Sequence, residues 1–99
     1  MGVGREGAGP GGLGTSRLAL LSRSGCHLCD VMEETLRQVL PRYGLEYRKI
    51  DVDDDSKLLE LYGDAVPVLL WGDREIARVR LTPGRLETLL TEQLRAEVG

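Results

Sequence analysis

The stretch Ser22–Leu40, SRSGCHLCDVMEETLRQVL, decides how this chain is organised, because it joins a loop to a helix and contains both cysteines, Cys26 and Cys29. Gly25 allows a flexible turn in the loop, so Cys26 falls in the first turn of the expected helix. Pro41 ends that helix. Its apolar face is formed by residues at helical spacing: Leu28, Val31, Met32, Leu36, Val39 and Leu40.

The position of the two cysteines predicts a working dithiol. Unpaired backbone N–H groups and the positive end of the helix dipole favour a negative sulfur at Cys26, and Arg23 just upstream adds a positive charge. Such surroundings lower a thiol pKa from about 8.5, and the thiolate is the form that attacks disulfides. Cys29 lies one turn further along nearly the same face and is expected to be less exposed. We therefore predict that Cys26 is the nucleophile and that Cys29 resolves the mixed disulfide.

The neighbouring residues narrow the other uses of a C-x-x-C motif. Haem attachment needs a His directly after the second cysteine, where this chain has Asp30. A closed zinc site needs four ligands, whereas this chain offers the two cysteines and, besides them, only His27. Two thiolates that bind a soft metal such as Cu(I), or an iron–sulfur cluster shared by two chains, stay open as an alternative, and so do two reduced core cysteines. His27 either tunes the thiolate or contacts a partner, or is simply exposed at the helix start.

Composition and charge exclude several classes of function. The 99 residues suffice for one domain. With a formal net charge of −3, one Trp, three Tyr and no Phe, the chain lacks the basic surface and the stacking aromatics of nucleic-acid binding proteins. It also lacks an apolar run that would span a membrane and an N-terminal secretory signal. We expect a cytoplasmic monomer, in a compartment that keeps thiols reduced unless they are catalytic.

The beginning of the chain differs in composition from the rest. Residues 1–16 are rich in glycine and have no periodic apolar pattern, which predicts a flexible tail before a single domain at residues 17–99. Two matches to the G-x-G-x-x-G motif begin in this tail, at Gly2 and at Gly9. A dinucleotide-binding loop needs a strand before the glycines and a helix after them, and neither pattern is present. We therefore predict no nucleotide site there.

Two strands are expected to flank the first helix. Residues 17–22 are mostly apolar, and residues 45–52 alternate between apolar and polar. Because a helix connects them, these strands should pair in parallel. A short helix then follows a cluster of aspartates at positions 51–55 and ends at Gly63. Negative charge suits a helix start, and the cluster lacks the glycine turn and the distal Glu of a calcium loop.

The remainder of the chain predicts a hairpin and a last helix. Residues 66–71 and 75–81 form two strands around a turn, and a helix begins at Pro83, capped by Thr82. The order of elements is β-α-β-α-β-β-α. This order predicts an α/β fold with a mixed four-stranded sheet that has helices on both faces.

Two segments of the sequence resemble a known family. LLSRSGCHLC, residues 20–29, is similar to the active-site segment of the glutaredoxins and their thioredoxin-fold relatives. IDVDDDSKLLELYGDAVPVLL, residues 50–70, is similar to their stretch that leads into a cis-proline. The resemblance covers about Leu18 to Leu94 and is strongest to small bacterial glutaredoxin-like proteins. It implies a thioredoxin-like (glutaredoxin-like) fold and a thiol–disulfide oxidoreductase.

The resemblance also implies roles for individual residues. Arg23 matches a basic residue that helps to hold a carboxylate of glutathione. Val66 and Pro67 match a valine and a cis-proline that face the dithiol and offer backbone N–H and C=O groups to the substrate. Together with Gly25 and His27, these residues form the expected substrate-binding set.

The expected partners follow from the same resemblance. The substrates are disulfide-containing or glutathionylated proteins, and the electron donor is glutathione or a reductase. No bound cofactor and no metal are expected, with glutathione as a co-substrate. Family members that bind glutathione well carry Gly-Gly and a following Asp before the last helix, whereas Gly84 stands alone here. The sequence therefore leaves the electron donor open, and the pair His27-Leu28 leaves the redox potential open.

Overall fold

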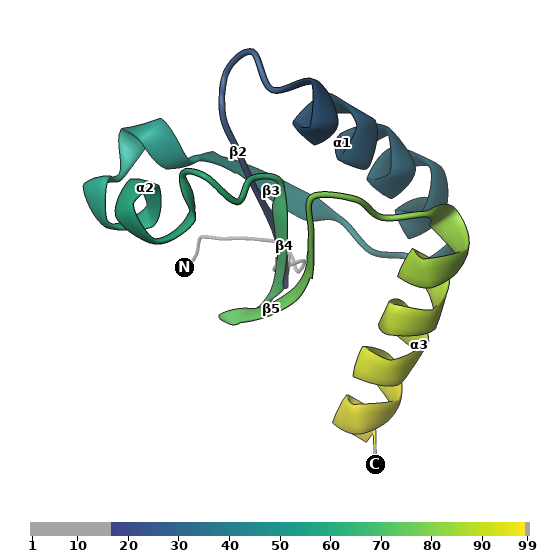
Figure 1. The fold of residues 1–99 in the computed structure, drawn as a ribbon. Coiled ribbons are helices and arrows are strands. Elements are labelled where there is room, and N and C mark those ends of the chain that lie inside the picture. The colour runs from purple at the N-terminus through teal and green to yellow at the C-terminus, as the bar shows by residue number, and fades with distance from the viewer. Residues whose placement is uncertain (1–16, 99) are drawn as a thin grey trace, which may run out of the picture.

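In residues 17–98, the part of the chain that the computed structural model describes, four strands and three α-helices follow one another in the predicted order (Figure 1). The predicted tail, residues 1–16 with its two G-x-G-x-x-G matches, lies outside the described residues. The strands are β2 (Leu18–Ser22), β3 (Tyr47–Asp51), β4 (Val68–Trp71) and β5 (Arg74–Arg78). The α-helices are α1 (His27–Val39), α2 (Ser56–Tyr62) and α3 (Pro83–Val98), and short 3-10 helices span Leu40–Tyr43 and Val52–Asp54.

The strand β2 lies inside the sheet, whose order is β3-β2-β4-β5. It runs parallel to β3, with Leu18 opposite Tyr47, and antiparallel to β4, with Leu21 opposite Val68. The strands β4 and β5 form an antiparallel hairpin that turns at Gly72, where φ is 65°. These pairings confirm the predicted mixed sheet. All five residues of β2 are buried, because the strand has neighbours on both sides and helices on both faces.

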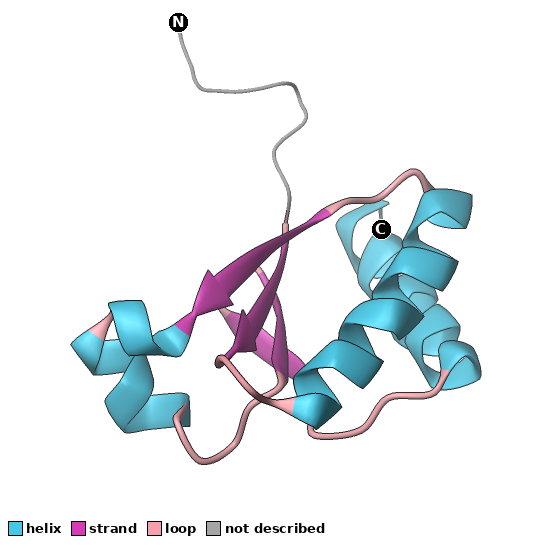
Figure 2. Ribbon diagram, turned by 90° about the horizontal axis from the view of Figure 1, so that it is seen from above, coloured by secondary structure: helices cyan, strands magenta, loops and turns pink. Residues whose placement is uncertain are grey.

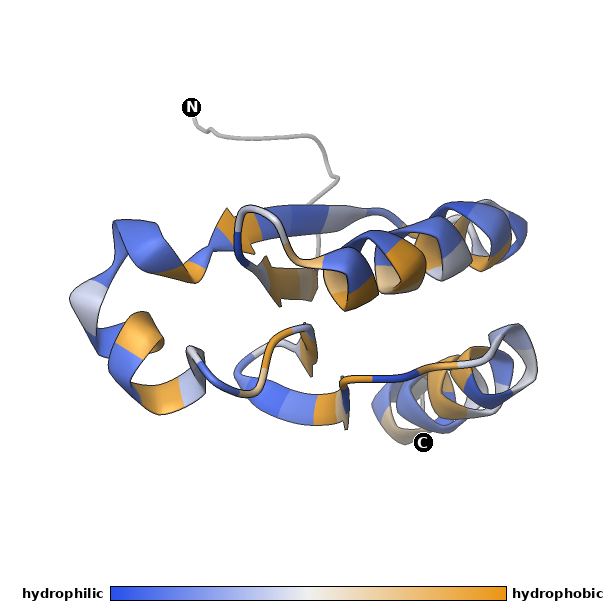
Figure 3. Cartoon of the chain, turned by 45° about the horizontal axis from the view of Figure 1, so that its top comes forward, coloured by the Kyte–Doolittle hydropathy of each residue, from blue (hydrophilic) through white to orange (hydrophobic). Residues whose placement is uncertain are grey.

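Helices cover both faces of the sheet, as predicted (Figure 2). The helices α1 and α3 lie on one face, where they enclose Leu20, Leu36 and Leu69. The helix α2 lies on the other face, over Leu21 and Val68. Successive residues of a strand point to opposite faces, so Leu20 and Leu21 belong to different halves of the core. Figure 3 shows the apolar residues of α1 and α3 on their inward sides.

The helix α1 differs in two details from its apolar pattern. It ends at Val39, one residue earlier than expected, and the chain continues in a 3-10 helix that contains Pro41. Val31, which we expected on the apolar face, is instead 47% exposed. The helix turns by about 100° per residue, so Val31 lies well around the helix from its neighbour Met32, which is buried.

The helix α2 begins at a cap and ends at a glycine, both as predicted. The Asp55 carboxylate accepts hydrogen bonds from the N–H groups of Lys57 at 2.9 Å and Leu58 at 3.1 Å. Gly63 does not adopt the left-handed conformation common for glycine at a helix end, because its φ is −51°. A Cβ atom at Gly63 would lie 2.5 Å from the Leu59 carbonyl oxygen. Close packing, rather than an unusual conformation, therefore requires glycine at this position.

The helix α3 begins as the sequence predicts. The Thr82 hydroxyl accepts a hydrogen bond from the Arg85 N–H at 3.1 Å, and Pro83 is the first helical residue. Leu86 and Leu90 are fully buried against the sheet and α1. None of the helices within residues 17–98 has the length and apolar composition needed to cross a membrane.

The side chain of Glu33 ties α1 to the edge strand β3. Only 10% of this side chain is exposed. Its carboxylate accepts hydrogen bonds from the Tyr47 hydroxyl at 2.6 Å and from the Lys49 ammonium at 3.1 Å, and it pairs with Arg37 at 3.4 Å. The Tyr47 hydrogen bond, followed by the Lys49 contact, holds the pKa of Glu33 below its ordinary value. Burial, reinforced by the Glu33 hydrogen bond, raises the pKa of Tyr47 to about 12.

Replacing Leu36 with Ala should strongly destabilise the protein. Leu36 is fully buried in the core shared by α1 and the sheet. Truncating a buried leucine costs about 2–5 kcal/mol, because transfer energy is lost and a cavity remains. Leu61→Ala is the matched control, since Leu61 is 61% exposed and its loss should change stability by no more than about 0.5 kcal/mol. Urea denaturation measures both free energies of unfolding, and equal losses would contradict the packing of α1.

Replacing Glu33 with Gln should remove a pH-dependent part of the stability. The folded-state pKa of Glu33 lies below its ordinary value of 4.5, so its contribution is complete above that pH and disappears as the pH falls through the folded-state pKa. At neutral pH the variant should lose about 1–3 kcal/mol. The gap to the wild type should narrow below pH 4.5.

Glu34→Gln is the control for this pH series, because the Glu34 side chain is 76% exposed and its one ion pair within residues 17–98 is with Arg37, at 3.8 Å. It should show neither the loss nor the pH dependence. Denaturation curves recorded from neutral to acidic pH measure the effect. A Glu33→Gln loss of constant size at every pH would show that the charge of Glu33 is not what stabilises the fold.

Candidate active site

The two cysteines lie at the junction between the inner strand β2 and the helix α1. After β2, the loop turns at Gly25, where φ is 74°, a left-handed conformation that suits glycine. Cys26 is the cap residue of α1, and its sulfur accepts a hydrogen bond from the Cys29 N–H at 3.1 Å. Cys26 and Cys29 form a disulfide, with their Cα atoms 5.2 Å apart.

The two sulfur-bearing residues differ in their access to solvent. Cys26 is half-buried, whereas Cys29 is 2% exposed. A reaction partner that approaches from solvent therefore meets Cys26 first. This difference follows from the helix geometry, because Cys29 lies one turn further along, on the side of α1 that packs against the core.

The start of α1 provides a positive electrostatic environment for Cys26. The first N–H groups of a helix have no partner within the helix, and the dipole places partial positive charge there. One of these groups, the Cys29 N–H, already points at the Cys26 sulfur. His27 is the first residue of α1 and is exposed, and Asp30 in the same turn donates its N–H to the Cys26 carbonyl at 3.2 Å. Backbone N–H groups are thus the polar groups that the start of α1 presents to the Cys26 sulfur.

The Val66-Pro67 peptide bond is cis, which confirms the implication of the resemblance. Because Val68 pairs with Leu21 in the antiparallel register, Pro67 lies at the same edge of the sheet as Ser22. The loop to Cys26 begins at that edge. Pro67 is buried and Val66 is half-buried. The structure therefore brings the dithiol loop and the Val66-Pro67 segment to one edge of the sheet, although they are far apart in the sequence.

A γ-turn at Val79 borders the same edge, and the sequence does not indicate it. We expected this strand to continue to residue 81, but β5 ends at Arg78. The Arg80 N–H donates to the Arg78 carbonyl at 2.7 Å, and φ of Val79 is 68°, a strained conformation for a β-branched residue. The Val79 N–H donates to the Pro67 carbonyl at 2.7 Å. The turn thus holds the end of β5 against the cis-proline.

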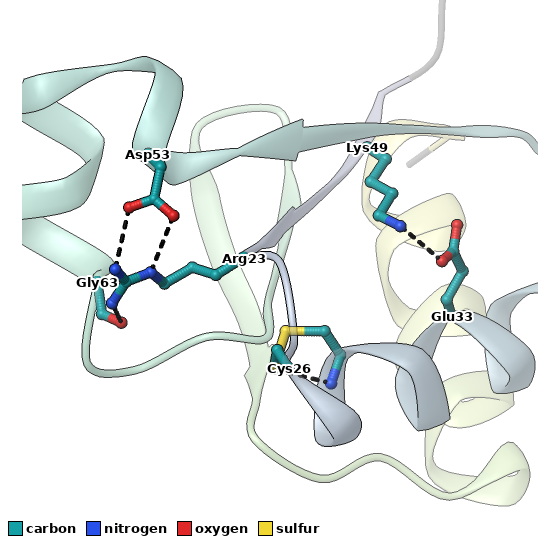
Figure 4. The surroundings of a disulfide bond; sticks show 7 residues. Arg23, Cys26, Glu33, Lys49, Asp53 and Gly63 are labelled. Carbon is teal, nitrogen blue, oxygen red and sulfur yellow. Dashed lines mark hydrogen bonds and ion pairs between the residues drawn. A yellow bond between two sulfur atoms is a disulfide. The ribbon is translucent and has the colours of Figure 1, made fainter.

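The side chain of Arg23 extends away from the disulfide, toward Asp53 and Gly63 (Figure 4). Its guanidinium pairs with the Asp53 carboxylate through Nη2 at 3.0 Å and Nε at 3.2 Å, and Nη1 donates to the Gly63 carbonyl at 3.4 Å. Among the clustered aspartates, Asp51 accepts the Asp53 N–H at 2.9 Å and Asp55 caps α2. The expected helix-start role holds for these two, whereas the partnership of Asp53 with Arg23 has no signal in the sequence.

A second charged pair, Glu33 with Lys49, lies on the far side of the helix start from Arg23 (Figure 4). A hollow of about 300 Å³ includes one cation from each pair and is lined by Ser22, Arg23, Ser24, Lys49, Asp51 and Asp54. Across residues 17–98, no three His, Cys, Asp or Glu side chains gather as a metal site. A metal at the two sulfur atoms would have to bind with the two thiolates alone or recruit ligands from elsewhere.

Comparison with known proteins relates this arrangement to a family. The family model "Glutaredoxin-like domain (DUF836)" matches residues 17–97. Protein XcR50 from X. campestris is 34% identical, with a TM-score of 0.64, over 76% of this chain and 96% of that chain. Protein Ne2328 from Nitrosomonas europaea is 30% identical, with a TM-score of 0.63, over 80% of this chain and 95% of that chain. No curated protein matches the sequence.

More distant structures share the fold. Thioredoxin 1 from Thermosipho africanus is 15% identical, with a TM-score of 0.59, over 83% of this chain and 98% of that chain. A buckwheat glutaredoxin, solved in complex with glutathione, is 24% identical, with a TM-score of 0.53, over 77% of each chain. Because the family match spans the cysteine pair and nearly all of the described fold, this chain belongs to the glutaredoxin-like domain family and has a thioredoxin-like fold.

Proposed function

We propose that this protein is a thiol–disulfide oxidoreductase in which Cys26 attacks the substrate and Cys29 resolves the intermediate. The observation that carries the proposal is the placement of the pair: a half-buried sulfur caps α1, and a buried sulfur lies within disulfide reach of it. The glutaredoxin-like family and the thioredoxin-like fold support the same general chemistry.

The reaction proceeds by two exchanges. The Cys26 thiolate attacks one sulfur of the substrate disulfide, forms a mixed disulfide and releases the other substrate sulfur as a thiolate, which takes up a proton. The Cys29 thiol loses its proton, and its sulfur then attacks Cys26. This step forms the internal disulfide and releases the second substrate thiol. The substrate gains two electrons and the Cys26–Cys29 pair loses two. An external thiol, glutathione or the dithiol of a reductase, returns the pair to the reduced state.

The Val66-Pro67 segment is the proposed docking edge for the substrate backbone. Val66 makes no hydrogen bond to another residue within 17–98, and its peptide groups lie beside the cis-proline at the edge that the dithiol loop shares. An extended substrate segment pairs with such groups by main-chain hydrogen bonds. The Pro67 carbonyl already accepts the Val79 N–H, so Val66 provides the groups for docking. The substrates in this proposal are disulfide-containing or glutathionylated proteins.

Replacing Cys29 with Ser should trap the intermediate. The variant retains the attacking sulfur at Cys26 but cannot complete the second exchange, so a mixed disulfide should accumulate. Intact-mass spectrometry after incubation with a disulfide-containing protein measures the adduct, and reduction should remove it. Cys26→Ser is the matched control, because its remaining sulfur is buried. Equal adduct on the two variants would contradict the assigned roles.

The thiol pKa of Cys26 should lie below the ordinary value of about 8.5. The Cys29 N–H and the partial positive charge at the helix start stabilise the thiolate, and neither of them titrates over the pH range of the experiment. The rate of alkylation of the Cys29→Ser variant, measured over a pH series, reports this pKa, because only the thiolate reacts. A midpoint at or above about 8.5 would remove the electrostatic basis for Cys26 as the nucleophile.

A further inference from the structure

We infer that Asp53 is a specificity-determining residue: by pairing with Arg23, it directs the exchange reaction away from glutathione and toward polypeptide disulfides that carry no free carboxylate beside the sulfur. This inference rests on the proposed function and names the substrate class of the same site. The residues that carry it lie on three separate elements. They are Arg23 after β2, Asp53 in the 3-10 helix after β3, and Gly63 at the end of α2.

The guanidinium of Arg23 is held from two directions. Its Nη2 and Nε atoms lie 3.0 and 3.2 Å from the two oxygens of Asp53, which is the two-point geometry that suits arginine and a carboxylate. Its Nη1 reaches the Gly63 carbonyl at 3.4 Å. Each of the two side chains is 39% exposed, so the pair lies at the surface, where a ligand in solution competes for Arg23. Figure 4 shows the side chain of Arg23 extended toward Asp53 and Gly63.

The loop between β2 and α1 contains no other basic residue besides Arg23. Glutathione carries two carboxylates and one ammonium group, so it approaches the dithiol as an anion and gains from a cation in the loop that carries Cys26, which is where Arg23 lies. In this protein the Asp53 carboxylate is already paired with that cation, Arg23. An intramolecular partner has an effective concentration in the millimolar range or above, so a glutathione carboxylate must displace Asp53 to reach Arg23.

The charge around this loop acts in the same direction. Asp51 and Asp54 line the hollow beside Arg23, and the remaining cation of that hollow, Lys49, is bound to Glu33 at 3.1 Å. An anion approaching from this side meets unbalanced negative charge. A polypeptide segment that is neutral or basic near its cysteine does not lose energy to this repulsion. The arrangement therefore selects by charge, before any side-chain contact is made.

The test measures how readily Cys26 binds glutathione, in a background that lacks Cys29. In the Cys29→Ser protein, the Cys26 thiolate and glutathione disulfide form the mixed disulfide and release one glutathione thiolate. Mass spectrometry across a series of glutathione redox buffers gives the equilibrium constant. Adding Asp53→Asn should raise this constant about five-fold at low salt, the size expected for release of a surface ion pair. The gain should shrink at high salt.

Asp54→Asn is the matched control. It removes the same charge from the same 3-10 helix, but no hydrogen bond or ion pair joins Asp54 to Arg23. The substitution therefore relieves only the screened repulsion around the hollow, and we expect a change of less than about two-fold. Adding Arg23→Gln to Asp53→Asn should abolish the gain, because the liberated cation is then missing. Equal gains for Asp53→Asn and Asp54→Asn, or a gain that survives Arg23→Gln, would overturn the inference.

A second substrate separates the failure of this inference from the failure of the proposed function. The same Cys29→Ser variants are incubated with a peptide disulfide that is neutral around its cysteines. Adding Asp53→Asn should change the formation of that mixed disulfide by less than about two-fold, because this peptide has no carboxylate near its cysteine that could bind Arg23. If adduct forms with the peptide but Asp53→Asn does not favour glutathione, the inference is wrong and the proposed function stands. If neither substrate forms an adduct, both are wrong.

Discussion

The hydrogen bond from the Cys29 N–H to the Cys26 sulfur is the constraint on which the proposed chemistry of this protein depends. It makes Cys26 the cap of α1 and, in the same position, the partner of Cys29 in the disulfide. The sulfur is therefore held by the backbone of the helix rather than by a flexible side-chain contact. Because β2 is buried inside the sheet and α1 packs on it, both ends of the short loop are fixed. A reactive group on rigid elements keeps its geometry.

The topology of the sheet explains why distant segments meet at this sulfur pair. The strands β2, β3 and β5 all end at the edge where β4 begins. The dithiol loop, the aspartates after β3, the cis-proline and the γ-turn at Val79 therefore all lie along this one edge. The two cations that line the hollow beside the dithiol loop are already paired: Arg23 with Asp53 and Lys49 with Glu33. In the proposed mechanism, stabilisation of a Cys26 thiolate therefore comes mainly from backbone amides, which do not titrate.

Elements and caps could be predicted from the sequence because each has a local cause. The helical spacing after Cys26, the Thr82-Pro83 start and the alternation in the strands are read from neighbouring residues. The cis peptide bond at Pro67 could be predicted only from the resemblance to the glutaredoxins. By contrast, the partner of Arg23 and the γ-turn at Val79 depend on contacts between segments far apart in sequence. Valine also favours strands, so its propensity points away from a positive φ. The packing of distant segments determines both features, and no local sequence pattern predicts them.

The most direct test is a single turnover of the reduced protein. The fully reduced chain is mixed with an excess of a disulfide-containing protein in the absence of air, and the thiols of both proteins are counted. We predict that each chain reduces one substrate disulfide to two thiols while Cys26 and Cys29 become the internal disulfide. Peptide mapping would locate that bond. A chain that retains both of its thiols, or that stops at a stable mixed disulfide on Cys26, would contradict a dithiol mechanism.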